Sequence, residues 1–208
     1  MSMRGIGRGT GPGVAAMLFV MACGSTDGES SAPGGADASH TTNARAILDG
    51  QIVSGNGNDC TGTPVLVGDF FALGSFGDTG AQPPLPASSV VDGSPIANGA
   101  VSVTCRVHES STGQFDVNVA AIGGGAFQLD GALTNTGDQA GIHVVGSRSE
   151  TRGAADFEAS DCTVQYLTAV QGVAMGRIWG RVTCASAKNG AGKTCSLVAD
   201  FRFESCEQ

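Results

Sequence analysis

Apolar and polar residues alternate along residues 101–121, and this is the clearest pattern in the chain. Every second position of 101–107 is Val or Cys, with polar residues between, and the alternation resumes over 115–121 after a turn at Ser111–Gly113. Successive side chains of a β-strand point to opposite faces, so a strict alternation gives the strand one apolar and one polar side. The pattern predicts an antiparallel hairpin with one buried and one solvated face.

Shorter apolar runs separated by Gly, Pro and Asn predict further strands on both sides of this hairpin. The Gly/Pro-rich segment Gly74–Ser89 (GSFGDTGAQPPLPASS) predicts a long loop without regular structure, where a binding surface is expected. Gly123–Gly125 predicts a bend, and Arg152–Asp161 suits a single helical turn. The other strands are expected at 44–53, 64–71, 127–133, 142–145, 162–167, 176–184 and 195–206.

About nine short strands joined by turns predict an all-β domain, an antiparallel β-sandwich or an irregular barrel. Composition agrees, because the 208 residues include 33 glycines and only 14% charged residues. Glycine disfavours a helix interior by about 1 kcal/mol relative to alanine. The length suits one domain, and residues 44–208 are expected to form it.

The N-terminus carries an export signal instead of a strand pattern. Arg4 and Arg8 precede an apolar run, Val14–Met21, which ends close to Ala22. This order of basic, apolar and small residues is typical of a secretory signal peptide, predicted here as residues 1–22. Eight residues of helix reach about 12 Å, too short for a bilayer core of about 30 Å, so a transmembrane helix is excluded for this run.

The segment after Cys23 is predicted to be a disordered tether. Residues 24–43 (GSTDGESSAPGGADASHTTN) contain almost no side chain large enough to enter a core. A flexible chain of this length has a root-mean-square reach of about 25 Å. We therefore assign residues 23–43 to the tether.

The mature chain is predicted to be strongly acidic. All 19 acidic residues lie beyond Cys23 and two of the 11 basic residues lie in the signal, which leaves a net charge of −10. Such a surface repels nucleic acid and anionic lipid headgroups, so no nucleic-acid partner is expected. The ordinary consequence of the charge is solubility, because the acids form no block.

The six cysteines beyond Cys23 predict a disulfide framework with 15 formal connectivities. Asn189-Gly190 is the strongest two-residue hairpin turn, and folding about it places Cys184 opposite Cys195. For the other four we favour pairs that stay within one half of the chain, a choice that no turn or register dictates. These pairs are Cys60–Cys105 and Cys162–Cys206.

No catalytic or metal-binding motif stands out. None of the cysteines forms a C-x₂-C pair, and the histidines His40, His108 and His143 are scattered, so no metal or cofactor is expected. A catalytic triad cannot be assigned from single residues of this kind. Trp179 and Tyr166 are the only amphipathic aromatic residues, and Trp179 is expected in the core, with a carbohydrate-binding face as the alternative.

Residues Val20-Met21-Ala22-Cys23 resemble the lipobox of bacterial lipoproteins, with an aliphatic residue at Val20 and a small residue at Ala22. The resemblance implies that Cys23 receives a diacylglycerol, that cleavage follows Ala22, and that the new amino group is acylated. The alternative is an ordinary signal peptide with an incidental cysteine.

Two weaker likenesses concern the domain. The segments DCTVQYL, GRIWGRVTC and KTCSLVADFRFESC resemble the C-terminal part of uncharacterised cysteine-containing bacterial lipoproteins. The segment VSVTCRVHESSTGQFDVNVAAIGG is similar to β-sandwich lipoprotein antigens of actinobacteria. Neither likeness implies an activity.

These features together predict an exported cell-envelope protein that is attached to a membrane through its N-terminal lipid. Gly24 in place of Asp implies, by resemblance to the sorting rule of Gram-negative lipoproteins, the outer membrane in such a host. The domain is expected to be structural or to bind a partner, such as an envelope protein or a glycan. A carbohydrate- or ligand-binding module is the alternative, and a hydrolytic enzyme the third hypothesis.

Overall fold

The computed structural model describes residues 43–54, 60, 67–77, 86–148 and 156–208. The chain divides into two compact units, residues 1–39 and 40–208, and all described residues belong to the second unit. The predicted signal peptide, Cys23 and the tether up to residue 42 lie outside the described residues. Within the described part there is no helix of the length and hydrophobicity needed to cross a membrane.

Nine strands lie edge to edge in one antiparallel sheet, in the order β2–β1–β15–β14–β12–β11–β10–β9–β8. Two short strands extend it, because β13 pairs with β14 and β5 pairs with β1, and β3–β4 and β6–β7 form two small separate sheets. The strands are β1 (Arg45–Val53), β2 (Gly68–Leu73), β3 (Ser75–Phe76), β4 (Pro86–Ser88), β5 (Val90–Val91), β6 (Pro95–Ile96), β7 (Gly99–Ala100), β8 (Ser102–Ser111), β9 (Gln114–Ile122), β10 (Gly125–Thr134), β11 (Gln139–Arg148), β12 (Phe157–Gln165), β13 (Gly172–Ala174), β14 (Arg177–Asn189) and β15 (Thr194–Glu204).

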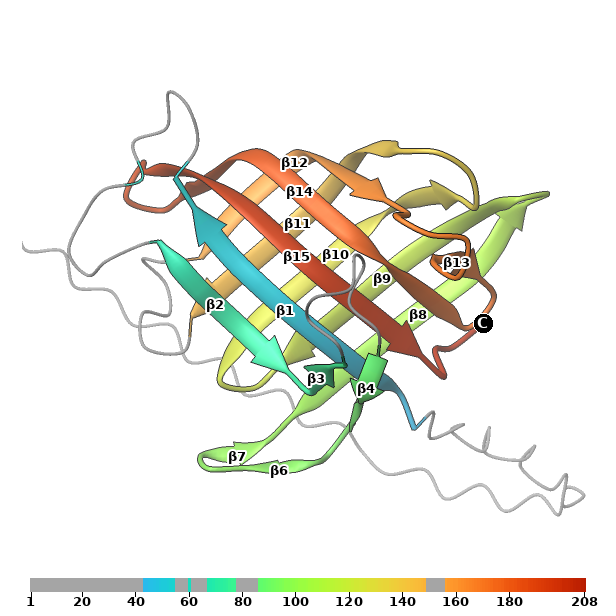
Figure 1. Ribbon diagram of the computed structural model, residues 1–208, viewed down its shortest axis with the longest axis horizontal. Coiled ribbons are helices and arrows are strands. Elements are labelled where there is room, and N and C mark those ends of the chain that lie inside the picture. The colour runs from blue at the N-terminus through green and yellow to red at the C-terminus, as the bar shows by residue number, and fades with distance from the viewer. Residues whose placement is uncertain (1–42, 55–59, 61–66, 78–85, 149–155) are drawn as a thin grey trace, which may run out of the picture. The chain divides into compact units, whose positions relative to one another are not determined.

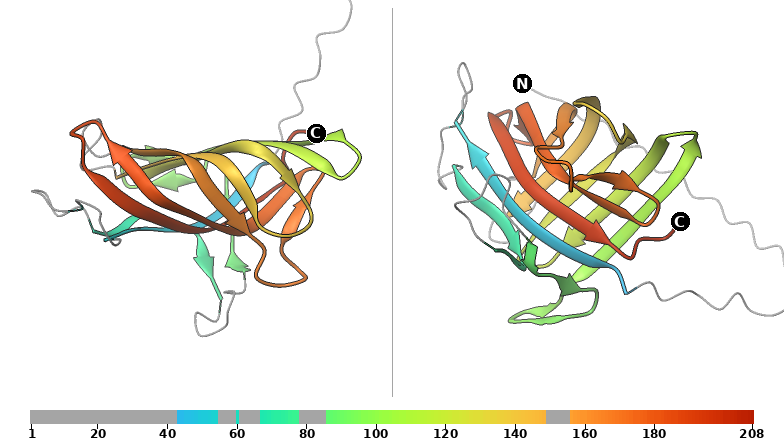
Figure 2. Two further views of the ribbon diagram at one scale, coloured as in Figure 1. Left: turned by 90° about the horizontal axis from the view of Figure 1, so that it is seen from above. Right: turned by 45° about the vertical axis from the view of Figure 1, so that its right-hand side comes forward.

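The large sheet curls into a half-barrel. Figure 1 shows β1, β15 and β14 in front of β8, β9 and β10, and the view from above in Figure 2 shows the sheet bending back on itself. The predicted all-β antiparallel class with disulfides is confirmed. Of the two predicted architectures, the irregular barrel fits better, because the main strands form one continuous sheet.

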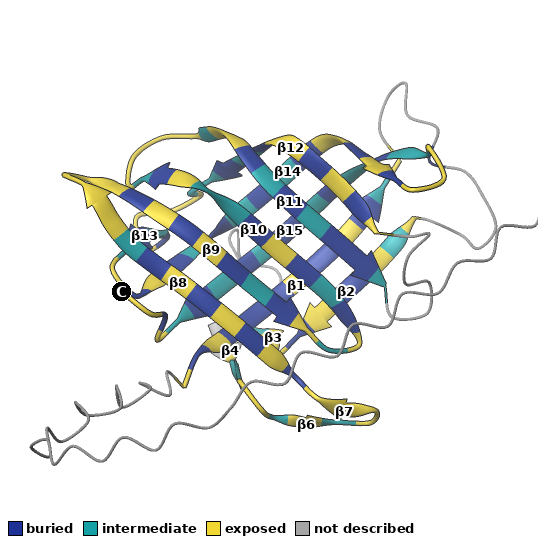
Figure 3. Ribbon diagram, turned by 180° about the vertical axis from the view of Figure 1, so that it is seen from behind, coloured by how far each residue is buried: buried dark blue, intermediate teal, exposed yellow. Residues whose placement is uncertain are grey.

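The alternation predicted for residues 101–121 is present in β8 and β9. Cys105 lies opposite Val119 and Val107 lies opposite Val117, with all four side chains buried. Figure 3 shows buried and exposed positions following each other along both strands. Inward-facing apolar side chains of a curled sheet share one interior, so this pattern builds the core.

Three phenylalanines connect the two halves of the curled sheet. The Phe127 ring on β10 lies 6.0 Å from the Phe201 ring and 6.3 Å from the Phe203 ring, both on β15, measured between centroids. All three side chains are fully buried. Ring separations of about 4.5–7 Å are the favourable range for aromatic pairs, so these contacts hold β10 against β15.

Phe70 of β2 fills a space that two glycines leave open. A Cβ atom at Gly50 of β1 would lie 2.3 Å from the Phe70 ring, and one at Gly146 of β11 would lie 3.0 Å from it. Any side chain at Gly50 would therefore displace the ring. The edge strand β2 is thus packed against the interior through Phe70, together with its buried neighbours Phe71 and Leu73.

Two expectations about local structure were wrong or incomplete. Within Gly74–Ser89, which was expected to lack regular structure, β3 and β4 form a short pair, and residues 78–85 lie outside the described residues. Pro86 is tolerated there because this two-residue ladder needs few donors. Of the expected helical turn at Arg152–Asp161, residues 157–161 belong to β12 and 152–155 are not described.

The predicted disulfide framework is present, but all three predicted pairings were wrong. The structure joins Cys60 to Cys195, Cys105 to Cys206 and Cys162 to Cys184. All six cysteines are buried. Two bridges therefore connect the first part of the chain to its last strand and tail, and the pairs Cys184–Cys195, Cys60–Cys105 and Cys162–Cys206 do not form.

The turn after β14 explains the error at Cys184. Asn189 does not start a two-residue turn, because its amide donates to Lys193 O (3.0 Å) and its side-chain oxygen accepts from the Lys193 amide (2.8 Å). Gly192, with a φ of 76°, supplies the left-handed conformation that was expected at Asn189-Gly190. A bulge between Cys184 and Ala187 then shifts the register.

Register on the other side of β14 places Cys184 beside its true partner. The bulge leaves Leu197 opposite Cys184 and Ala187 opposite Cys195. On β12, Thr163 pairs with Thr183, so the residue before it, Cys162, lies directly across from Cys184 with Cα atoms 4.2 Å apart. The bridge is therefore a cross-strand link between neighbours.

The C-terminal tail attaches the edge strand β8 to the opposite part of the sheet. The Val107 amide donates to Glu207 O (2.9 Å), and the Glu207 amide donates to Cys105 O (2.8 Å). Between these hydrogen bonds lies the Cys105–Cys206 disulfide. Part of an otherwise unpaired edge is thereby satisfied, which also protects it from pairing with other chains.

The bend at Gly123–Gly125 gives a stability test. A Cβ atom at Gly125 would lie 2.6 Å from Ser147 O and 2.9 Å from Phe70 O, whereas one at Gly124 would meet nothing within 4 Å. Gly125→Ala should lower the free energy of unfolding by about 1–3 kcal/mol, because backbone atoms must move apart. Gly124→Ala should stay within about 0.5 kcal/mol. Urea denaturation measures both, and equal effects would contradict the packing described.

The disulfides give a second test. On the chain-entropy model, a bridge across 101 residues stabilises the fold by about 4–5 kcal/mol and one across 22 residues by about 3 kcal/mol. The double variant Cys105→Ala/Cys206→Ala should therefore lose more stability than Cys162→Ala/Cys184→Ala. Chemical denaturation with the remaining bridges intact measures the difference, and the reverse order would contradict it.

Candidate functional site

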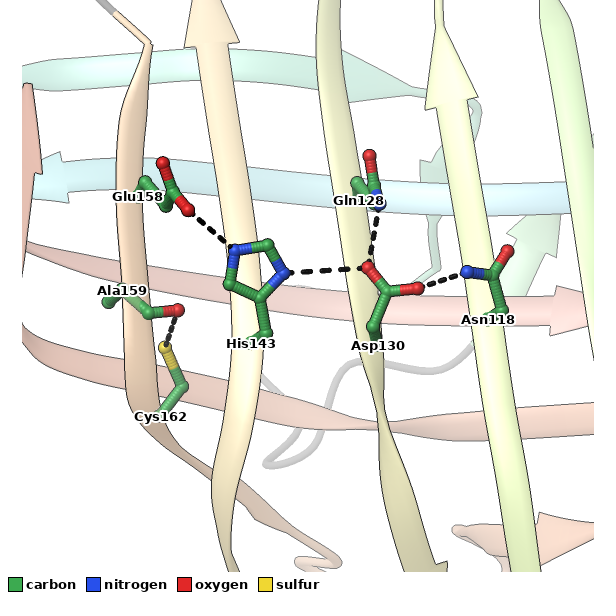
Figure 4. A network of polar contacts seen from close by, with 7 residues as sticks. All are labelled: Asn118, Gln128, Asp130, His143, Glu158, Ala159 and Cys162. Atoms are coloured by element: carbon green, nitrogen blue, oxygen red, sulfur yellow. Dashed lines mark hydrogen bonds and ion pairs between the residues drawn. The ribbon is translucent and has the colours of Figure 1, made fainter. Parts of the chain in front are cut away.

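A chain of polar side chains crosses four strands on the outer face of the sheet (Figure 4). His143 of β11 lies between two carboxylates, with Nδ1 3.6 Å from Asp130 Oδ2 and Nε2 3.0 Å from Glu158 Oε1. Asp130 also accepts from Gln128 Nε2 (2.7 Å) and from Asn118 Nδ2. Outward-facing positions on β9, β10, β11 and β12 thus form one connected network.

This network has the parts of an acid–base pair but not their usual arrangement. In a catalytic triad, one histidine nitrogen faces the orienting acid and the other faces the nucleophile. Here Glu158 faces the second nitrogen of His143, where a serine or cysteine nucleophile would have to lie. The geometry therefore fits a tie between β10, β11 and β12 better than a nucleophile–base pair.

A hollow of about 680 Å³ lies next to this network. Glu158 belongs to both, and most of the other lining residues carry acidic, hydroxyl or amide groups, with Lys188 as a cation. The hollow opens where β12 and β14 separate between their two paired stretches. Its lining residues are Asp156, Glu158, Ala159, Ser160, Asp161, Ser186, Lys188, Asn189 and Gly190.

The remaining sequence candidates do not gather into a second centre. His108 of β8 faces Asp116 of β9 at 3.7 Å, near the exposed end of their hairpin, and His40 lies outside the described residues. Among the described residues, no group of three His, Cys, Asp or Glu side chains is arranged to hold a metal ion. Figure 4 also marks Cys162 Sγ, 3.8 Å from Ala159 O, but this sulfur is bonded to Cys184 and has no hydrogen to donate.

Trp179 was expected in the core, and this was wrong. It is half-buried on the outer face of β14, where the Arg202 guanidinium lies 5.1 Å from its ring centroid. A groove of about 160 Å³ surrounds it, and its lining includes Val170 and Arg177 together with Glu204. The alternation along β14 predicts the outward position once Ile178 and Val182 are placed inward.

Tyr166, the other amphipathic aromatic residue, points the opposite way. It packs against the core beside Gly180, and its hydroxyl is buried without a hydrogen-bond partner among the described residues. Burial raises the pKa of Tyr166 to about 12. Trp179 and Tyr166 therefore do not share one binding face.

Sequence inspection missed a cluster of charges on β1, β14 and β15. Arg181 donates two hydrogen bonds to Asp200, Nε to Oδ1 at 2.9 Å and Nη2 to Oδ2 at 2.7 Å. Asp49 lies opposite Asp200 in the register. Burial raises the pKa of Asp49, with smaller contributions from Asp69 and Asp200, while Arg181 lowers it. No local motif signals this cluster, because strand pairing alone brings it together.

Comparison with known protein families, curated proteins and solved structures found no match to this chain.

The Asp49 cluster predicts a pH-dependent effect on stability. A carboxyl with a raised folded-state pKa binds its proton more tightly in the folded state, so its favourable contribution exists below the unfolded pKa and is lost as the pH rises. Asp49→Asn should therefore stabilise the protein at pH 7, by about 0.2–1 kcal/mol for a solvent-screened group. The gain should disappear below about pH 4. Thermal unfolding at both pH values measures it. Arg181→Gln should act in the opposite direction at pH 7, and a gain from both variants would contradict the assignment.

Proposed function

We propose that this protein is an exported, lipid-anchored cell-envelope protein whose β domain, residues 44–208, serves as a structural or binding module and not as a catalyst. Cys23 carries the lipid after cleavage behind Ala22, and residues 23–43 separate the domain from the membrane. In a Gram-negative host, Gly24 favours the outer membrane.

The disulfide pattern is the observation that supports this proposal. The chain has seven cysteines, and the three bridges use six of them, all within the β domain. Disulfides of this kind are typical of oxidising compartments outside the cytoplasm. The seventh cysteine is Cys23, which follows the apolar signal run at the position where lipoproteins carry their lipid. Multiple acyl chains are needed for firm anchoring, and the lipoprotein modification supplies them.

A ligand-binding module is the second candidate, and the groove at Trp179 favours it. A half-buried indole next to Arg177, Arg202 and Glu204 offers one apolar face and several hydrogen-bonding groups, as glycan sites do. The groove is small, and the Arg202 guanidinium already lies over the indole ring. A glycan would have to displace that side chain in order to stack.

The anchor is tested by Cys23→Ser in cells. The variant should move from the membrane fraction to the soluble fraction, because the thiol that accepts the diacylglycerol is gone. Met21→Leu keeps the lipobox pattern and is the matched control, which should remain membrane-bound. Mass spectrometry of the purified wild-type N-terminus should show cleavage after Ala22 and acylated Cys23. A membrane-bound Cys23→Ser variant, or an unmodified wild-type N-terminus, would overturn the proposal.

A further inference from the structure

One end of the β domain carries apolar side chains on turns, where polar residues are usual. The described residues include five exposed large apolar side chains, and three of them lie between positions 167 and 175. Val170 and Met175 are the two most exposed, at 61% and 56% of their full surface. Leu167, at 40%, is the other member of this group. We call Leu167, Val170 and Met175 the apolar tip.

Both turns of the apolar tip are held in place by hydrogen bonds. Val170 lies in a turn closed by the Gln171 amide, which donates to Thr168 O (3.1 Å), and the buried Gln171 side chain accepts from the Leu167 amide. The next strand, β13, is tied to the β10–β11 loop, because the Val173 amide donates to Asn135 Oδ1 (3.2 Å). The exposure of Val170 is therefore imposed by the fold.

Met175 is fixed by the same tail that joins β8 to the opposite part of the sheet. The Gly176 amide donates to Val107 O (3.0 Å), and Gly176 O accepts from the Cys206 amide (3.0 Å). Cys206 is bonded to Cys105. The turn that carries Met175 is thus hydrogen-bonded on two sides, and the Met175 side chain is exposed.

The chain enters the domain at this same end. Arg45, the first residue of β1, lies opposite Glu204 on β15, and Glu204 lies opposite Arg177, the first residue of β14. These three residues form one row across three strands, directly after Met175-Gly176. The segment that leads back to Cys23 therefore joins the domain beside the apolar tip.

The outer face next to the tip has the residues that favour a membrane interface. Val170 lines the Trp179 groove, and Arg45 and Arg177 are exposed nearby in a chain that is otherwise strongly acidic. Indole rings prefer the boundary between hydrocarbon and water, and arginine interacts with anionic headgroups. Glu204 lies between Arg45 and Arg177 in the row, so the charges at this end are mixed, whereas the chain as a whole is strongly acidic.

We propose that the apolar tip and the Trp179 face form a second membrane contact, with Val170 and Met175 inserted among the headgroups of the bilayer that holds the Cys23 lipid. This inference rests on the proposed lipid anchor. A tether turns the second contact into an intramolecular event, so that even a weak interfacial affinity is sufficient. The domain then lies on the membrane with the start of β1, at Arg45, facing the bilayer.

Trp179 is the only tryptophan in the chain and gives a native probe for this contact. The full-length lipidated protein is reconstituted in vesicles of phosphatidylcholine and phosphatidylglycerol (3:1) that contain a lipid with a quencher near the headgroup. Trp179 fluorescence should be quenched by the shallow probe. The double variant Val170→Ser/Met175→Ser should lose at least half of that quenching, because its tip no longer inserts.

Ile122→Ser is the matched control. Ile122 is 44% exposed but pairs with Ser102, five residues along β8 from Val107, and therefore lies away from the tip. Its quenching should equal that of the wild type. Non-reducing peptide mapping should show the Cys162–Cys184 bridge in every variant, which establishes that each one is folded.

The anchor and the second contact fail in different ways. A protein that floats with the vesicles but whose Trp179 is unquenched would overturn the second contact and leave the anchor intact. The Cys23→Ser variant, which carries no covalent lipid, tests the contact without the anchor when it is mixed with the same vesicles. Its Trp179 quenching should rise with lipid concentration and disappear in the Val170→Ser/Met175→Ser background. No quenching at any lipid concentration would overturn the contact. Burial of Trp179 in the absence of lipid, increasing with protein concentration, would also overturn it and would assign the tip to an interface with a second copy of the chain.

Discussion

The attachment of β8 to the tail after β15 is the constraint on which the rest of the structure depends. A curled sheet encloses its apolar face only if its two halves stay together. The Cys105–Cys206 bridge and the backbone hydrogen bonds of Glu207 supply that link at one end, and the contacts of Phe127 with Phe201 and Phe203 supply it in the interior. The same tail holds Gly176, and through it the turn that exposes Met175. The same tail contacts therefore close the domain and fix the turn at the apolar tip.

Local pattern was sufficient to predict most of the long strands, but not the short ones or how the strands associate. The alternation in β8 and β9 is decided by which face is buried, and that can be seen in the residues themselves. The disulfide pairs depend on which strands are neighbours, and β12 pairs directly with β14 although β13 lies between them in the sequence. The bulge between Cys184 and Ala187 shifts the register of β14 against β15, and no residue of the turn predicts this shift. Asn189 also formed a longer, side-chain-capped turn, although Asn-Gly favours a two-residue one.

The candidate sites were harder to predict for the same reason. The His143 network unites residues from four strands, and Asp49 meets Asp200 only because the first and last strands pair. Trp179 was misplaced because a large aromatic residue on a strand suggests a core, whereas the neighbouring Ile178 and Val182 already occupy the inward positions. Exposed Val170 and Met175 carry no sequence signal. Their significance comes from the turns that hold them and from the place where the chain enters the domain.

The connectivity of the bridges bears on how such a chain matures. Cys60 and Cys105 find their partners, Cys195 and Cys206, within the last 14 residues of the sequence. When a polypeptide is threaded across a membrane from its N-terminus, these two thiols arrive first and meet each other long before their partners appear. Oxidation in order of arrival would join Cys60 to Cys105, a pair absent from the folded domain. For an exported chain of the kind we propose, the native pairs therefore form only if the thiols stay reduced until the end of translocation, or if an isomerase exchanges the first bridge formed.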